Sequence, residues 1–164
     1  MIFVWAFIGI VIQTILGETF SLAGMTPDLP LIIVAFNAIF DGPRKGAYTG
    51  VGIGLLEDLY IGRFIGMNAL IKGVVGFISG RLTQGAFREN MWVPVLTVMI
   101  NSALSIVMYY LTGRILGEQW GLSALYWKGI PQFVYTLCLA PFLYGPFFGF
   151  ANRHLNKQEG WDEI

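Results

Sequence analysis

Apolar residues in this chain form long runs that are separated by short polar segments. A helix needs about 20 apolar residues to cross the hydrocarbon core of a bilayer, with a range of roughly 17–25. This length predicts six membrane-spanning helices, over residues 2–20, 24–41, 46–61, 64–82, 91–113 and 130–150. The pattern therefore predicts an all-α, polytopic membrane bundle that residues 1–164 form as a single integral membrane domain.

The composition agrees with a membrane protein. Of the 164 residues, 55% are hydrophobic and 12% are charged, and the mean hydropathy is +0.65. Soluble domains carry about 25% charged residues. Ten basic and ten acidic residues cancel, so nothing indicates a nucleic-acid partner. The single cysteine, Cys138, excludes a disulfide within the chain, and the single histidine, His154, forms no metal-ligand pattern, so we expect no metal and no cofactor.

The positions of lysine and arginine predict how the chain is oriented, because these residues are enriched on the cytoplasmic side of a membrane. Six of them fall on one side of the predicted bundle: Arg44, Lys45, Arg81, Arg88, Arg153 and Lys157. The other side has Arg63, Arg114 and Lys128, and Lys72 lies inside the fourth run. We therefore expect a multi-pass membrane protein with both termini in the cytoplasm.

The longest predicted loop, residues 113–129, lies on the opposite side and is rich in aromatic residues. Trp120, Tyr126 and Trp127 are of the types that settle at the level of the lipid headgroups. The loop is interpreted either as a helix lying on the bilayer or as a docking surface for an extracytoplasmic partner.

The segment TPDLP opens the second run with residues that commonly begin a helix. Thr26 is placed to cap the helix, and Pro27 fits the first helical position, where its missing N–H group is not needed. Asp28 then lies in the first turn, where the helix dipole favours a carboxylate. Helix-start chemistry explains all three residues, and a further role of Asp28 in holding a partner or ligand stays open.

Three glycines of the third run, Gly46, Gly50 and Gly54, recur every four residues and form one row on a helix. Lipid provides no hydrophobic driving force between helices, so close contact through small residues supplies much of their association. We expect this helix to lie in the centre of the bundle and to touch at least two neighbours. Packing within the chain is the simpler interpretation, and binding of another protein's helix is the alternative.

Charged residues occur at the end of the third run and inside the fourth run. Asp58 continues the glycine row, Glu57 points about 100° away from it, and Lys72 lies deeper in the fourth helix. A charge inside a membrane costs about 2.5–3.5 kcal/mol at the centre, so we expect these groups to pair. With a tight turn at Gly62 to Phe64, the two helices form an antiparallel hairpin, in which Lys72 can reach either Glu57 or Asp58. Asp58 is predicted to be the partner of Lys72 and Glu57 is the second choice. The pair is interpreted as structural, with a proton relay or an ion site as the alternative.

The remaining polar residues predict structure and no catalysis. Asn37, Asn68 and Asn101 are expected to form hydrogen bonds between helices, and Pro141 is expected to kink the last helix. No serine, cysteine or histidine has a basic partner at a useful spacing, and no glycine-rich phosphate loop follows a strand. The sequence therefore does not predict an enzyme.

The segment TPDLPLIIVAFNAIFDGPRKGAYTGVGIGLLEDLYIGRFIGMNALIKGVVGFISGRL resembles the MreD family of bacterial rod shape-determining proteins. The family has Pro-Asp at the head of the second span, a basic turn, a glycine-rich third span ending in GLL-x-D, and a fourth span rich in glycine and leucine. The matching residues are Pro27, Asp28, Gly46, Gly50, Gly54, Leu55, Leu56, Asp58, Gly62 and Gly66.

This resemblance implies a non-enzymatic scaffold of the complex that builds peptidoglycan along the side wall. Such proteins associate with MreC, a single-span protein, near the MreB filament, the glycosyltransferase RodA and a transpeptidase, the class B penicillin-binding protein. The chain is also similar to the six-helix substrate-binding subunits of energy-coupling-factor transporters, which implies an alternative function as a membrane subunit that binds a vitamin-like compound. Those subunits use alanines at i and i+4 of the first span, where this chain has Ala6 followed by Ile10.

Overall fold

The computed structural model describes residues 26–62, 64–85, 90, 92–117, 123 and 125–159 of the chain. Its elements are α2 (Leu29–Asp41), α3 (Pro43–Ile61), α4 (Met67–Leu82), α5 (Trp92–Ile115), the short π-helix η1 (Leu125–Gly129) and α7 (Ile130–Glu159). The described part of the chain contains no strand. Five of the six predicted runs thus form helices, and the first predicted run, residues 2–20, lies outside the described residues.

The largest differences from the predicted helix boundaries are at the start of α2 and at the end of α7. α2 begins at Leu29 and not at residue 24, because Asp28 and not Thr26 is the residue that caps it. α7 continues to Glu159 and not only to residue 150, since no proline or glycine interrupts the polar segment that follows Gly149 until Gly160.

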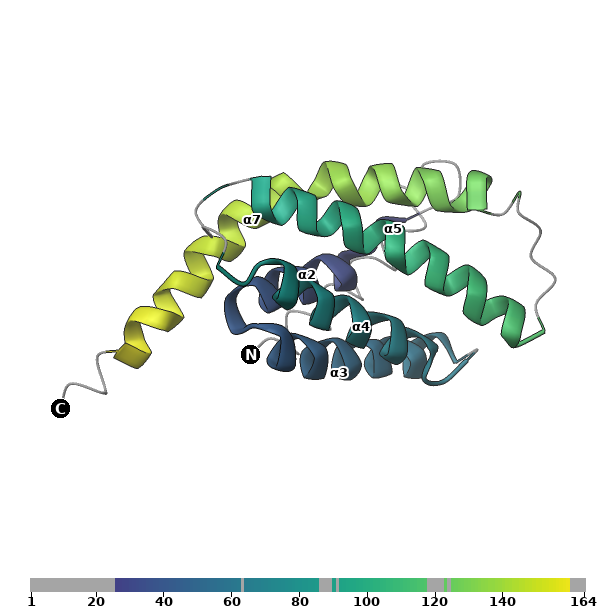
Figure 1. Cartoon of the computed structure of the whole chain (residues 1–164), viewed down its shortest axis with the longest axis horizontal. Coiled ribbons are helices and arrows are strands. Elements are labelled where there is room, and N and C mark those ends of the chain that lie inside the picture. Colours follow the sequence, from purple (N-terminus) through teal and green to yellow (C-terminus); the bar gives the residue numbers. More distant parts are fainter. Residues whose placement is uncertain are drawn as a thin grey trace.

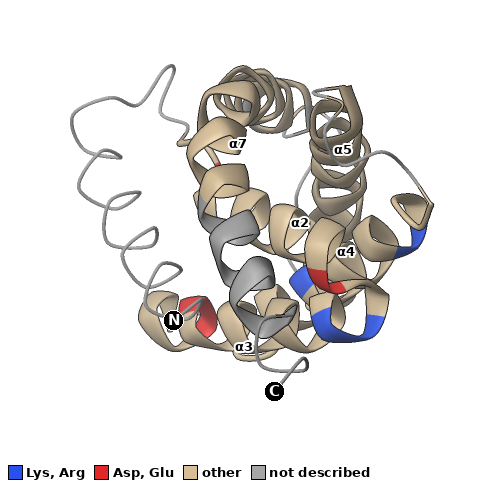
Figure 2. Ribbon diagram, turned by 90° about the vertical axis from the view of Figure 1, so that its left-hand side faces the viewer, with Lys and Arg blue, Asp and Glu red and all other residues tan. Residues whose placement is uncertain are grey.

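The helices form two groups. The antiparallel hairpin of α3 and α4 lies side by side with α2, and α5 pairs with α7 on the other side of α2 (Figure 1). α5 also contacts α4, and both α5 and α7 contact α2. Seen from the end in Figure 2, the other described helices surround α2. This arrangement brings the beginning of α2 next to the hairpin and to α7.

α2 is the central helix of the described bundle. Eleven of its 13 residues are buried, which follows from a sequence that is apolar on every face. The expectation that α3 would be central is therefore wrong, although α3 does touch two neighbours, α2 and α4. α3 buries only one row of residues and leaves large apolar side chains such as Leu55 and Leu59 exposed.

An aromatic cluster joins α2 to α7. Phe36 and Phe40 of α2 contact Tyr144, Phe147 and Phe148 of α7, with ring centroids 5.1–6.4 Å apart. α7 changes direction near the middle of its length in Figure 1. Its interior prolines explain the bend, because each removes a backbone hydrogen bond and its ring crowds the preceding turn.

The polarity of α5 is inverted relative to a helix of a soluble protein. Its buried face carries Thr97, Asn101, Ser102 and Ser105, and its exposed face carries large apolar residues. The exposed residues are Trp92, Leu96, Ile100, Val107, Leu111 and Ile115. Among the described helices, α5 is the one whose length and composition suffice to cross a membrane, and the apolar α2 is shorter than a full span. The six-span bundle and its likeness to transporter subunits stay predictions.

Candidate functional site

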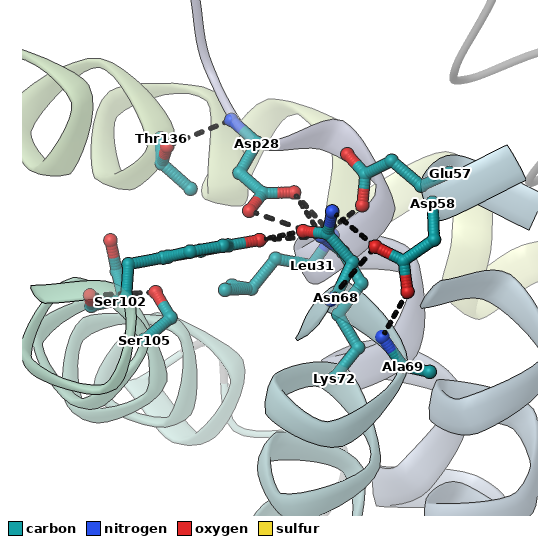
Figure 3. A network of polar contacts seen from close by, with 11 residues as sticks. Asp28, Leu31, Glu57, Asp58, Asn68, Ala69, Lys72, Ser102, Ser105 and Thr136 are labelled. Carbon is teal, nitrogen blue, oxygen red and sulfur yellow. Dashed lines mark hydrogen bonds and ion pairs between the residues drawn. The ribbon is translucent and has the colours of Figure 1, made fainter. Parts of the chain in front are cut away.

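Lys72 of α4 lies at the centre of a buried polar network, with an exposed fraction of 0%. Its ammonium group donates a hydrogen bond to Glu57 and lies 3.4 and 3.5 Å from the two carboxylate oxygens of Asp28. The hydroxyl of Tyr109 is 3.4 Å away. Figure 3 shows Lys72 next to Asp28 and Glu57. Because a buried charge without partners is costly, these contacts from three other helices are what allow a lysine to lie inside the bundle.

Asp58 does not pair with Lys72, and this prediction is wrong. The two carboxylate oxygens of Asp58 accept hydrogen bonds from the start of α4 instead. They lie 2.8 Å from the backbone nitrogen of Gly66, 3.0 Å from that of Asn68, 3.1 Å from that of Ala69 and 2.8 Å from the side-chain nitrogen of Asn68. The counter-charges of Lys72 are Glu57, which the prediction named as the second choice, and Asp28.

The local sequence explains why Asp58 caps the start of α4. The residue at the N-cap of α4 is Gly66, which has φ of 100° and no side chain with which to accept the free N–H groups of the first turn. Glycine adopts this left-handed conformation without strain, so the chain can reverse tightly between the two helices. A carboxylate from the end of α3 then takes the place of the missing cap and also gains from the dipole of α4.

Asp28 joins two functions in one side chain. One carboxylate oxygen accepts a hydrogen bond of 2.9 Å from the backbone nitrogen of Leu31, which makes Asp28 the N-cap of α2. The same carboxylate contacts Lys72. The backbone nitrogen of Asp28 donates a hydrogen bond of 3.1 Å to the hydroxyl of Thr136 on α7. Pro27 is buried but precedes this cap, so its predicted place at the first helical position is wrong, and Pro30 is the proline in the first turn. Helix-start chemistry is thus confirmed for Asp28, and the contact with Lys72 is an additional role.

Tyr109 and Thr136 are two members of the site that the sequence analysis missed. The Tyr109 hydroxyl donates to the side-chain oxygen of Asn68, so α5 is joined to the same network. Asp28, Glu57, Asp58, Asn68, Lys72 and Tyr109 are called the buried polar network from here on. No local signal marks Tyr109, because an aromatic residue in an apolar run is most often a packing residue.

The glycine row of α3 lies against α4 and α2. A methyl group added at Gly50 would lie 2.0 Å from the carbonyl oxygen of Lys72, and one added at Gly54 would lie 2.4 Å from that of Asn68. At Gly46 it would meet Ala38 of α2 at 2.5 Å. The three glycines that the sequence analysis singled out therefore form the contact surface on which the hairpin is assembled, within the chain.

The three amides form hydrogen bonds between helices, as predicted. Asn37 donates to Thr49 at 3.2 Å, which links α2 to α3. Asn101 donates to Ser79 at 2.6 Å, which links α5 to α4, and its buried side-chain oxygen has no partner among the described residues. Together with Asn68, these bonds spread polar contacts along the whole interior of the bundle.

The arrangement holds the described helices together. The carboxylates and the ammonium group are directed at one another and at helix ends. Within the described ranges, no group of three or more His, Cys, Asp or Glu residues could hold a metal ion. The chemistry that the site supports is electrostatic and hydrogen-bonded cross-linking of α2, α3, α4, α5 and α7.

Comparison with known proteins identifies the family. The family model described as rod shape-determining protein MreD matches residues 1–154, which is nearly the whole chain. The searches of curated proteins and of solved structures gave no match. The matched region contains the capped start of α2, the glycine row of α3 and the buried polar network. This chain belongs to the MreD family of rod shape-determining proteins.

Proposed function

We propose that this chain is a non-enzymatic membrane scaffold of the bacterial cell-elongation machinery, with a part in organising peptidoglycan synthesis. Its family supports a role in determining rod shape. The observation that carries the proposal is the inverted polarity of the helices. Glycines, amides and charged groups are used in contacts inside the chain, whereas the exposed faces are apolar. Such a protein can hold other membrane helices and needs no reaction centre.

The inverted polarity also supports a multi-pass topology in the cytoplasmic membrane. α3 exposes Val51, Leu55 and Leu59 while it buries Glu57 and Asp58, which is favourable only where the surroundings are apolar. The basic residues Arg44 and Lys45 in the first turn of α3 support a cytoplasmic location for that end of the hairpin, by the positive-inside rule. Both termini are then cytoplasmic.

We assign the motif residues a structural role in this scaffold. Asp28 caps α2 and Pro27 precedes this cap. The row of Gly46, Gly50 and Gly54 sets the distance between α3 and its neighbours. Asp58 caps α4, and Lys72 links α4 to α3 and to the start of α2. All seven are buried. A partner therefore meets the outer faces of the helices, whose shape these residues determine, and does not meet the residues themselves.

The partner that fits this surface is the single membrane span of an MreC-like protein. The exposed rows of α3 and α5 are long, apolar and free of charge over several turns, as at Leu55, Leu59, Val107 and Leu111. Helices associate in lipid through van der Waals contact along such faces. Through this partner the scaffold is placed next to MreB, RodA and the class B penicillin-binding protein.

The test is co-purification from membranes of bacteria that produce the tagged chain together with an MreC-like protein. The control partner carries the same extracytoplasmic domain on an unrelated apolar span of equal length. We expect the natural partner to be recovered in a stoichiometric amount and the control partner to be lost. Photo-crosslinking from Leu55 and from Val107 then identifies the helix that makes the contact.

Two outcomes would contradict the proposal. If the folded chain recovers neither partner, it is not a scaffold for this class of protein. If it recovers both equally, the contact lies in the extracytoplasmic domain and not in the membrane. Cells that lack this chain should also lose their rod shape, and cells that remain rods would contradict the role itself.

The alternative function, a subunit that binds a vitamin-type compound for transport, gains no support from the comparisons. The polar groups of the interior are paired with one another, with the exception of one oxygen of Asn101 among the described side chains.

A further inference from the structure

Three basic side chains, Arg44, Lys45 and Arg81, gather at one end of the hairpin and are called the basic edge. Arg44 and Lys45 lie in the first turn of α3, and Arg81 lies in the last turn of α4. These two turns touch, since a methyl group added at Gly80 would lie 2.4 Å from the backbone nitrogen of Pro43. All three side chains of the basic edge are exposed. Figure 2 is viewed from this end and shows basic positions gathered beside α3 and α4.

The charges of the basic edge are available to a partner outside the chain. Arg44 and Lys45 form no hydrogen bond or ion pair with a described residue, and Arg81 has one exposed bond of 3.4 Å to Gln84. Asp41 is the acidic side chain at this end of the hairpin among the described residues, and it is not paired with the three cations. The edge therefore keeps an excess of positive charge, in contrast to Lys72, whose charge is neutralised inside the bundle.

The surface next to the basic edge identifies the kind of partner. One helical turn from Arg44 lies Tyr48, which is 77% exposed, and one turn from Arg81 lies the exposed Phe77. Trp92, 70% exposed, begins α5 at the same end of the bundle (Figure 1). Further along α3 the exposed surface is aliphatic. Cations, then aromatic rings, then aliphatic side chains follow the order of chemical layers from the headgroups to the acyl chains of a bilayer.

We propose that the basic edge binds the phosphate headgroups of anionic lipids, so that the chain selects these lipids over zwitterionic ones. A nucleic acid or an acidic protein domain would also attract three cations, but neither requires the aromatic and aliphatic layers that continue the edge along the same helices. The bound lipid lies with its headgroup at Arg44, Lys45 and Arg81 and its acyl chains against the exposed faces of α3 and α4. This lipid preference goes beyond the proposed scaffold function; it rests on the proposed multi-pass topology and not on the binding of a protein partner.

The test uses the full chain reconstituted in bilayers of equal amounts of phosphatidylglycerol and phosphatidylcholine, followed by native mass spectrometry of the lipids that stay bound. The variants are Arg44→Gln, Lys45→Gln, Arg81→Gln and the triple substitution. The control is Arg114→Gln, an exposed arginine in the last turn of α5, at the other end of the molecule. These side chains are exposed, and their replacement by another polar residue leaves the buried contacts unchanged.

We expect the wild-type chain to retain phosphatidylglycerol in preference to phosphatidylcholine. Each single substitution should lower this preference by about fivefold or less, as expected for one basic residue at an anionic surface. The triple substitution should abolish the preference, and Arg114→Gln should leave it unchanged. A triple variant that keeps the wild-type preference would overturn the proposal. A loss of lipid preference in Arg114→Gln as large as that in the single variants of the basic edge would also overturn the proposal, because the net charge of the chain and not the basic edge would then be responsible.

Discussion

Replacing Gly50 by alanine adds one methyl group at the point where α3 and α4 come closest. The added carbon would lie 2.0 Å from the carbonyl oxygen of Lys72 and 2.6 Å from its carbonyl carbon. Both atoms belong to the backbone of α4, so no side chain can rotate away to make room. The two helices would have to move apart by more than about 1 Å to restore an ordinary contact, since interiors are packed without spare volume.

The magnitude follows from two opposing terms. Forcing an extra carbon into a well-packed contact costs about 1–3 kcal/mol, and a clash with backbone belongs at the upper end of this range. Alanine gains up to about 1 kcal/mol over glycine inside a helix. We therefore expect Gly50→Ala to lower the free energy of unfolding by about 2 kcal/mol.

Gly145→Ala on α7 is the matched control for this prediction. A methyl group at Gly145 meets nothing within 4 Å, so only the helix-forming advantage of alanine remains. The control should be neutral or more stable than the wild type by up to about 1 kcal/mol. The two glycine-to-alanine substitutions should thus differ by about 2–3 kcal/mol in the free energy of unfolding, or roughly 30- to 140-fold in the unfolding equilibrium.

The assay is reversible unfolding in mixed micelles, in which sodium dodecyl sulfate is titrated against a mild detergent and helix content is followed by circular dichroism. The contact between α3 and α4 is also measured separately, by crosslinking a pair of cysteines placed at exposed positions on the two helices. If Gly50→Ala and Gly145→Ala unfold at the same point, the glycine row does not set the distance between the helices and the reasoning is refuted.

Three further substitutions test the buried polar network by the same unfolding assay. Asp58→Ala should lower the free energy of unfolding by about 2–4 kcal/mol and increase hydrogen exchange in the first turn of α4, because it leaves three backbone N–H groups without an acceptor. Unchanged hydrogen exchange in that turn would contradict the capping role. Lys72→Met should lower the free energy of unfolding by about 3–5 kcal/mol, because it leaves two carboxylates unpaired. Replacing Glu57 by Gln and Asp28 by Asn in the same chain should recover part of that loss. No recovery would mean that lost packing is the cause. Tyr109→Phe should cost about 0.5–1.5 kcal/mol and loosen α5 more than the hairpin in hydrogen exchange, and a uniform effect on all helices would argue against a specific link.

The helices could be predicted from the sequence because the length of each apolar run is directly visible in it. The ends of the helices were less visible. Asp28 and Thr26 are both good capping residues, and only the position of Pro30 inside the first turn favours the later start. The central position of α2 was also missed, although its lack of any polar face apart from Asn37 is a sequence signal for burial on all sides.

The charged residues of the site were predicted from the sequence, whereas their pairing and the two further members Tyr109 and Thr136 were not. Lys72 needs a counter-charge, and two neighbouring acids on α3 were equally near in sequence. The choice depends on the free N–H groups of α4, which compete with Lys72 for a carboxylate. Gly66 at the start of α4 is the signal that was overlooked, because a helix that begins at a residue without a side chain takes its cap from elsewhere. Tyr109 contacts Asn68 from α5, a helix that is distant in sequence, and the residues around Tyr109 carry no signal that predicts this contact.

The cap that α3 provides for α4 has a consequence for how the protein is made. Both partners of this contact emerge from the ribosome close together, so the pair can form in the membrane before α5 and α7 are synthesised. α5 and α7 then pack against a hairpin that is already formed, in which Lys72 is in position to contact Tyr109. A nascent chain halted after Leu82 should therefore already resist protease as a pair of helices, and the same chain carrying Asp58→Ala should be cut between them.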